Sequence, residues 1–227
     1  MNTRRIIFWV CFLIILALII WGLAASMSRP IAVNGVPAGS PAPVSTTDHV
    51  KASGSAGAFV DVNAQVTLIE YSDFQCPACE NYYYFVEKLL QDEPTSTVRF
   101  IYRYFPLPQH ANAIPSAMAT EAAGLQGKFW DMYSLIFKNH ADWTELTDPT
   151  SVFVGYATTL GLDTAKFTAD LKNATSTSVV QADLASGQVA GIDSTPTFFV
   201  NGKAIANQPT YADFKKLIDQ AASAGSQ

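Results

Sequence analysis

The stretch that decides the fold is Thr67-Leu-Ile-Glu-Tyr-Ser-Asp-Phe-Gln-Cys-Pro-Ala-Cys79. Its first half continues an apolar run that starts at Val66, which is typical of a buried strand ending near Tyr71. A turn follows, and a helix is predicted to begin at Cys76. Pro77 suits the first turn of that helix, where a missing N–H costs nothing. The pattern therefore predicts a strand, a turn and a helix with two cysteines at its start.

The position of the two cysteines indicates thiol chemistry. Cys76 falls at the helix N-terminus, where free N–H groups and the helix dipole favour a negative charge. A thiol placed there loses its proton more easily, and the thiolate is the reactive form. Cys79 lies one helical turn further on, close enough to form a disulfide with Cys76. The pair thus points to reversible disulfide exchange.

A Cys-x-x-Cys pair has two other common uses. A zinc site normally needs four ligands, but the remaining cysteine, Cys11, lies in an apolar run, and His49, His110 and His140 are scattered. A purely structural disulfide would close a very small loop and stabilise the chain little. The strand–turn–helix context favours a redox pair, and no metal is expected.

Two segments together resemble a known family. They are Phe74-Gln-Cys-Pro-Ala-Cys79 and, far downstream, Ser194-Thr-Pro-Thr-Phe-Phe-Val-Asn-Gly-Lys203. The chain from about Phe59 onward is similar to the DsbA-like thiol-disulfide oxidoreductases of the thioredoxin superfamily, and most of all to their membrane-anchored, BdbD-like branch. The resemblance implies an α/β thioredoxin fold with an all-helical insertion at about 107–192.

The coarse pattern of elements agrees with an α/β class. Alternation and apolar runs predict strands at 59–62, 66–71, 98–104, 197–200 and 203–206. Amphipathic segments and stop signals predict helices at 76–91, 112–126, 127–139, 150–160, 163–172, 177–189 and 211–222. The Asn201-Gly202 pair is a strong hairpin signal between the last two strands.

The N-terminus predicts a membrane anchor over residues 1–27. Ile6 to Ala25 is an apolar run long enough to cross a bilayer, and Arg4 and Arg5 precede it. A cleaved signal peptide is the alternative, although its apolar region is usually shorter. Either reading exports the rest of the chain. Residues 28–57, rich in Pro, Gly, Ala, Ser and Thr, are expected to be a flexible linker, with His49 solvated in it, and 58–227 to form the domain.

Charge and cysteine usage narrow the partners and the compartment. Three of the 14 basic residues lie in the first 29 positions, which leaves 11 basic and 19 acidic residues, a formal charge of −8, in the exported part. This balance argues against nucleic acid as a partner, because binding to phosphates needs a basic face. An extracytoplasmic compartment suits a persistent disulfide, and the exported part holds only Cys76 and Cys79.

Roles for individual residues follow from this reading. Cys76 is the predicted nucleophile, and Cys79 resolves the mixed disulfide. By resemblance, Thr195-Pro196 is expected to be a cis peptide beside the disulfide that presents its backbone to a peptide substrate; the alternative is an ordinary proline at a strand start. Ala78 departs from the histidine of the strongest oxidants in the family, so we expect a weaker oxidant.

Glu70 stands six residues before Cys76 in an apolar strand. The family places an acid at this position, and a buried carboxyl could relay a proton to or from Cys79. The alternative is a carboxylate at the end of the sheet. His110 and Glu121 are expected to be a polar residue at a helix start and a solvated helix position, and Trp130 to belong to the core.

The main functional hypothesis is a membrane-tethered enzyme, N-terminus in the cytoplasm, that donates its Cys76–Cys79 disulfide to exported proteins. Its substrates would be reduced exported proteins, a membrane quinone-linked thiol oxidase would reoxidise it, and the redox-active disulfide needs no cofactor. Two alternatives stay open. One is a reductase or isomerase on the same fold, and the other is a non-catalytic peptide-binding module whose cysteines only brace the fold.

Overall fold

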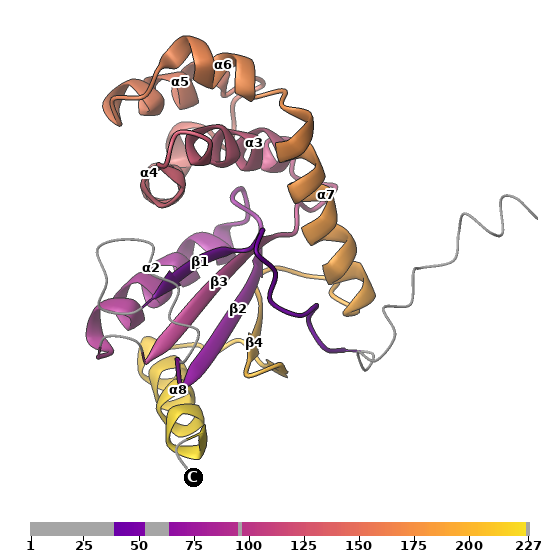
Figure 1. Ribbon diagram of the computed structural model, residues 1–227. Coiled ribbons are helices and arrows are strands. Elements are labelled where there is room, and N and C mark those ends of the chain that lie inside the picture. Colours follow the sequence, from indigo (N-terminus) through magenta and orange to yellow (C-terminus); the bar gives the residue numbers. More distant parts are fainter. Residues whose placement is uncertain (1–38, 53–63, 95–96, 226–227) are drawn as a thin grey trace, which may run out of the picture. The chain divides into compact units, whose positions relative to one another are not determined.

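A five-stranded mixed sheet is the centre of the computed structural model, which describes residues 39–52, 64–94 and 97–225 (Figure 1). The strands run in the order β1-β3-β2-β4-β5. Their bounds are β1 His49–Ala52, β2 Val66–Ser72, β3 Val98–Tyr104, β4 Thr197–Val200 and β5 Lys203–Ile205. β2 pairs parallel to β3 and antiparallel to β4. β2 is therefore the central strand, which explains why its sequence is a nearly continuous apolar run.

The face of the sheet that carries Leu68 and Glu70 supports the active-site helix. α2, Pro77–Asp92, and α8, Tyr211–Gly225, pack on it. α2 buries Cys79, Tyr83, Val86, Leu89 and Leu90 on one side, the spacing of an amphipathic helix. Burial of this apolar stripe fixes α2 over β2, and so fixes where the two cysteines stand.

The opposite face is covered by α7, Ala174–Val189. Ile69, Tyr71 and Phe105 contribute to its core. Gly187 lies against Phe105 so closely that an added Cβ would approach the Phe105 ring to 2.6 Å. A glycine is required there because it lets the helix backbone meet the aromatic ring directly.

The helical insertion lies between β3 and β4 and ends with α7. Its other helices are α3 Ala113–Gly124, α4 Phe129–Lys138, α5 Thr150–Thr159 and α6 Thr164–Asp170, with a 3₁₀ turn, η1, at His140–Asp142. α7 begins three residues before the predicted start. The reason is Asn173, whose side chain accepts hydrogen bonds from the N–H groups of Thr175 and Ser176 and so caps the helix.

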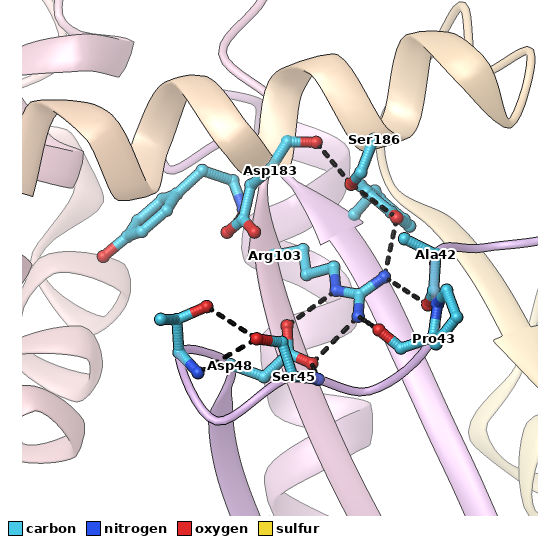
Figure 2. A network of polar contacts seen from close by, with 10 residues as sticks. Ala42, Pro43, Ser45, Asp48, Arg103, Asp183 and Ser186 are labelled. Atoms are coloured by element: carbon cyan, nitrogen blue, oxygen red, sulfur yellow. Dashed lines mark hydrogen bonds and ion pairs between the residues drawn. The ribbon is translucent and has the colours of Figure 1, made fainter. Parts of the chain in front are cut away.

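The segment before the domain is ordered from residue 39 to 52, which corrects the expectation that 28–57 is a flexible linker throughout. β1 pairs with β3 in antiparallel register, His49 opposite Tyr102. Figure 2 shows what holds the preceding turn. Arg103, buried on β3, donates to both carboxylate oxygens of Asp48, to the carbonyls of Ala42 and Pro43, and to the Tyr71 hydroxyl. These five hydrogen bonds leave the buried guanidinium fully paired.

Two expected solvent positions are in fact buried contacts. His49 stacks on Phe129 at 3.6 Å between ring centroids, and its Nε2 lies 2.6 Å from the Glu121 carboxylate. Glu121 also accepts a hydrogen bond from the Tyr104 hydroxyl. The expectation that His49 and Glu121 are solvated was therefore wrong, because β1 brings the histidine onto the insertion. Trp130 packs against the core, as expected.

Two predicted segments, the strand at 59–62 and the apolar run at 6–25, lie outside the described residues. Within the described ranges, no helix has the length and apolarity that crossing a membrane requires.

Candidate active site

Cys76 occupies the N-cap of α2, and Pro77 is the first helical residue. The Cys76 N–H donates to the Asp73 carbonyl at 3.1 Å, and its own carbonyl accepts the first intrahelical bond, from Glu80. The side chain therefore stands at the tip of the helix, where unpaired N–H groups gather. Both Cys76 and Cys79 are free thiols in this structure.

The surroundings of Cys76 favour its thiolate. Its pKa falls from 9.0 to about 5, chiefly because the Cys79 thiol can donate a hydrogen bond to it. Partial burial opposes this shift, while the Thr195 side chain and the N–H groups of Cys79 and Ala78 add to it. Hydrogen bonds to the charged form are thus the main cause, and the helix start supplies two of them.

Thr195 and Pro196, which follow the helical insertion in sequence, lie beside Cys76. The peptide bond between them is cis, as the resemblance implied. The Cys76 Sγ lies 3.5 Å from the Thr195 carbonyl oxygen, within the reach of a thiol hydrogen bond. β4 begins at Thr197, so the start of this strand brings both residues beside the reactive sulfur.

Cys79 and Glu70 lie below Cys76 in the core. Burial raises the pKa of the Cys79 thiol well above 9.0, and the neighbouring Cys76 and Glu70 add to the rise. Burial also raises the pKa of Glu70 from 4.5 to about 8; the nearby Ser72 hydroxyl works against this, and Cys76 adds to it. Glu70 is only 1% exposed, so its carboxyl does not lie at an open end of the sheet.

The helical insertion holds the loop that precedes Cys76. The Gln75 side chain donates to the Thr144 carbonyl and accepts from the Asn112 N–H, at 2.7 and 2.6 Å. Asp73, also buried, accepts from the Gln75 N–H with one oxygen and lies 2.7 Å from His110 Nδ1 with the other. This brace fixes the backbone from which Cys76 projects.

His140 adds a second contact from the insertion. Its Nε2 lies 3.1 Å from the Gln75 carbonyl, and its Nδ1 lies 3.3 Å from a carboxylate oxygen of Glu80, the residue after Cys79. The imidazole therefore bridges the active-site loop and the first turn of α2. Sequence analysis gave no role to His140, Gln75 or Asn112.

All seven predicted site residues fall in one place. Pro77 and Ala78 lie between the two cysteines in the first turn of α2. Around them lie the other five residues, which are Cys76, Cys79, Glu70, Thr195 and Pro196. The residues that sequence reasoning missed are the polar ones just before the pair. Their closeness in sequence to Cys76 was the available signal, but their partners are 37 to 69 residues away.

A thioredoxin fold with a helical insertion and a Cys-x-x-Cys pair at a helix tip define the class of thioredoxin-like proteins. Residues 61–220 match the protein family described as Thioredoxin, and the chain belongs to that family.

Solved structures with similar folds include BdbD from Bacillus subtilis in its oxidised form. At 22% identity, it is matched with a TM-score of 0.68 over 84% of this chain and 100% of that one. The α-DsbA1 protein of Wolbachia pipientis, 18% identical, gives a TM-score of 0.67 over 80% of this chain and 94% of that one. Likeness at this level of identity establishes the fold.

The curated relatives are longer proteins with a thioredoxin-like part. The Na(+)/H(+) antiporter NhaA 1 of Salinispora arenicola is 36% identical over 141 residues, 62% of this chain and 21% of the antiporter. The NhaA antiporter of Herminiimonas arsenicoxydans is 37% identical over 142 residues, with the same shares. The match thus spans about a fifth of these antiporters.

Proposed function

We propose that the chain is an extracytoplasmic, membrane-tethered thiol-disulfide oxidoreductase that donates the Cys76–Cys79 disulfide to exported proteins. The observation that carries this proposal is that the pKa values of the two thiols shift in opposite directions. Hydrogen bonds lower the pKa of Cys76 to about 5, while burial raises that of Cys79 well above 9.0. One sulfur is thus a stable thiolate, and the other is held as a thiol.

This split of the two pKa values supports the oxidase direction of the reaction. A stabilised Cys76 thiolate stabilises the dithiol form, so the disulfide becomes the stronger oxidant. A substrate thiolate attacks Cys76 and displaces the Cys79 thiolate, which takes a proton. A second substrate thiolate then attacks the substrate sulfur of the mixed disulfide, forms the substrate disulfide and releases the Cys76 thiolate. The substrate loses two electrons, and the enzyme gains them.

Thr195 and Pro196 provide the place for the substrate backbone. They lie beside Cys76 at the start of β4, and an extended peptide could pair there as an added strand. Reduced exported proteins are the proposed substrates, and a membrane quinone-linked thiol oxidase is the proposed reoxidant. The membrane tether rests on the apolar run at residues 6–25. The kinship with parts of sodium–proton antiporters, themselves membrane proteins by name, accords with it.

Equilibration with a glutathione redox series tests the direction of electron flow. We expect a reduction potential above about −200 mV but below that of DsbA, because Ala78 cannot add a charged group beside the thiolate. A potential near thioredoxin's, about −270 mV, would instead indicate the reductase. Efficient shuffling of a scrambled substrate would indicate the isomerase.

Whether the cysteines carry out the reaction can be tested in cells that depend on this protein for disulfide formation. Cys76→Ser should abolish disulfide formation in exported proteins. Normal disulfide formation with this variant would leave a peptide-binding module whose cysteines only brace the fold. Fractionation of the same cells tests the tether: the chain should resist extraction with alkaline carbonate, and release into the soluble fraction would contradict it.

A further inference from the structure

A group of unpaired polar atoms lies beneath Cys79. Among the described residues, the Glu70 Oε2 and the hydroxyls of Tyr102 and Tyr133 are buried without a hydrogen-bond partner. A buried polar atom left unpaired is unfavourable, and most such atoms in proteins are satisfied by other groups or by ordered water. These three groups, with the unpaired Ser72 hydroxyl near Glu70 as a fourth, therefore require an explanation.

The fold brings these three groups together. Glu70 and Tyr102 are register partners on the parallel strands β2 and β3, so their side chains leave the same face of the sheet as neighbours. The Tyr133 ring, on α4, packs edge-on against the Tyr102 ring at 5.1 Å between centroids. All three side chains are at most 1% exposed. The three residues belong to two strands and one helix, and the site lies where these meet under α2.

The electrostatics agree with this placement. Burial raises the pKa of both phenols, and among the charges Glu70 raises each of them most. Cys79 raises the pKa of Tyr102 as well. The other titratable groups that act on the three residues are Asp73, Cys76, Tyr83, Glu87 and Tyr104. None of these is basic, so the site gives an ionised Glu70 no counter-charge, which accords with its raised pKa of about 8.

We propose that Glu70, Tyr102 and Tyr133 hold ordered water beneath Cys79, and that the two tyrosines are positioning residues for the transfer of the Cys79 proton. This inference rests on the proposed function, because it describes how the buried thiol of that reaction gains and loses its proton. A water held there has three polar partners, which is the usual number for buried water. It links the Cys79 thiol to the enclosed Glu70 carboxyl, so that a proton can move between them.

The balanced step is the closing of the disulfide. With Cys76 joined to a glutathione sulfur, the Cys79 thiol gives its proton to the Glu70 carboxylate through the water. The Cys79 thiolate attacks the Cys76 sulfur, the Cys76–Cys79 bond forms, and glutathione leaves as its thiolate. Glu70 then releases the proton to solvent, which resets it.

Rapid mixing of the reduced protein with glutathione disulfide separates two steps. Samples quenched with acid and weighed by mass spectrometry show the formation of the mixed disulfide and then its collapse. Tyr102→Phe and Tyr133→Phe should each slow the collapse by about 3- to 10-fold, since loss of general acid–base assistance costs rate. Formation should be unchanged, because the attacking group is the Cys76 thiolate, which needs no proton transfer from Cys79.

Tyr156→Phe is the matched control. The Tyr156 hydroxyl, on α5, is likewise buried and unpaired, but the charge that acts on it is that of Asp142 rather than Glu70 or Cys79, so its removal should leave both steps unchanged. The combination Glu70→Gln with Tyr102→Phe should collapse no more slowly than Glu70→Gln alone, because both changes interrupt one path. A merely structural effect of Tyr102 would add to that of Glu70.

The outcomes separate this inference from the proposed function. The water site alone would be overturned if both tyrosine variants form the mixed disulfide normally and collapse it at the wild-type rate. It would also be overturned if Tyr156→Phe slows the collapse as much as they do. Failure of the wild-type protein to form any mixed disulfide would overturn the thiol chemistry and the inference with it. A crystal structure supplies an independent check: a water bound to Glu70 and both tyrosine hydroxyls supports the site, and a dry cavity overturns it.

Discussion

The Cys76 Sγ lies 3.5 Å from the carbonyl oxygen of Thr195, although 119 residues separate the two in sequence. The helical insertion accounts for most of that separation, and it leaves the sheet after β3 and returns at β4. The reactive sulfur is therefore positioned by three separate parts of the chain: the start of α2, the loop before β4 and the insertion.

The first prediction concerns the charge on Cys76. In the reduced protein, the ultraviolet absorbance of the thiolate should appear with a midpoint near pH 5, because the Cys79 side chain and the helix N–H groups stabilise the anion. The Cys76→Ser variant should show no such transition. A midpoint near pH 8.5, that of a free cysteine, would contradict the assignment of Cys76 as the activated thiol.

The second prediction isolates the contribution of Thr195. The Thr195→Val variant keeps the backbone carbonyl and the side-chain shape but loses the hydroxyl, which lowers the pKa of Cys76. We expect the Cys76 pKa to rise by up to about one unit and the disulfide to become a weaker oxidant. Thr197→Val, just beyond the cis proline, is the control and should leave the Cys76 pKa unchanged.

The third prediction is a pH dependence of stability due to Glu70. Its pKa is about 8 in the folded protein and 4.5 as a model group. The contribution of Glu70 to stability is therefore fully present below about pH 4.5 and is lost as the pH rises towards 8. Glu70→Gln should match the parent at pH 4 and exceed its free energy of unfolding by on the order of 3 kcal/mol at pH 9.

Urea unfolding at a series of pH values checks this prediction. Both proteins should carry Cys76→Ser, so that the thiolate does not titrate in the same range. A constant difference between the two proteins across the whole pH range would show that Glu70 ionises normally in the folded state.

The fourth prediction concerns the ion pair between Arg103 and Asp48. Both side chains are at most 3% exposed, and the pair is bidentate, at 2.8 and 2.9 Å. Asp48→Asn would leave a buried guanidinium without its counter-charge, so the free energy of unfolding should fall by about 3–5 kcal/mol. Limited proteolysis should then cut within residues 42–48.

Asp131→Asn is the control for this prediction. Its pair with Lys128 is about half exposed on both sides, so the loss should stay below about 1 kcal/mol. If Asp48→Asn and Asp131→Asn lower the free energy of unfolding equally, burial does not make the Arg103–Asp48 pair more important for stability.

The elements that the sequence predicted well are those with a strong local pattern. The β3 bounds match the alternation of residues 98–104, and the Asn201-Gly202 turn joins β4 to β5 as expected. Cys76 and Cys79 were identified because their chemistry depends on local position at a helix start. The cis peptide at Thr195-Pro196 came from the family resemblance rather than from any pattern in the residues.

The parts that were missed depend on contacts between distant segments. β1 was hidden because His49–Ala52 has no apolar pattern of its own and is held through β3 and Arg103. The brace formed by Gln75 and Asn112 joins a loop to a helix 37 residues away. The unpaired hydroxyls of Tyr102 and Tyr133 could not be recognised, because the sequence shows only aromatic residues suited to a core.

The placement of β1 determines which strand edges of the sheet are open to other polypeptides. An open strand edge invites aggregation, because extended polypeptide can pair with its free backbone groups. β1 shields β3 over residues 99–102, and the opposite border of the sheet is β5, only three residues long and headed by Lys203. The long strand β3 is therefore covered, and the described sheet ends on both sides in short strands of four and three residues.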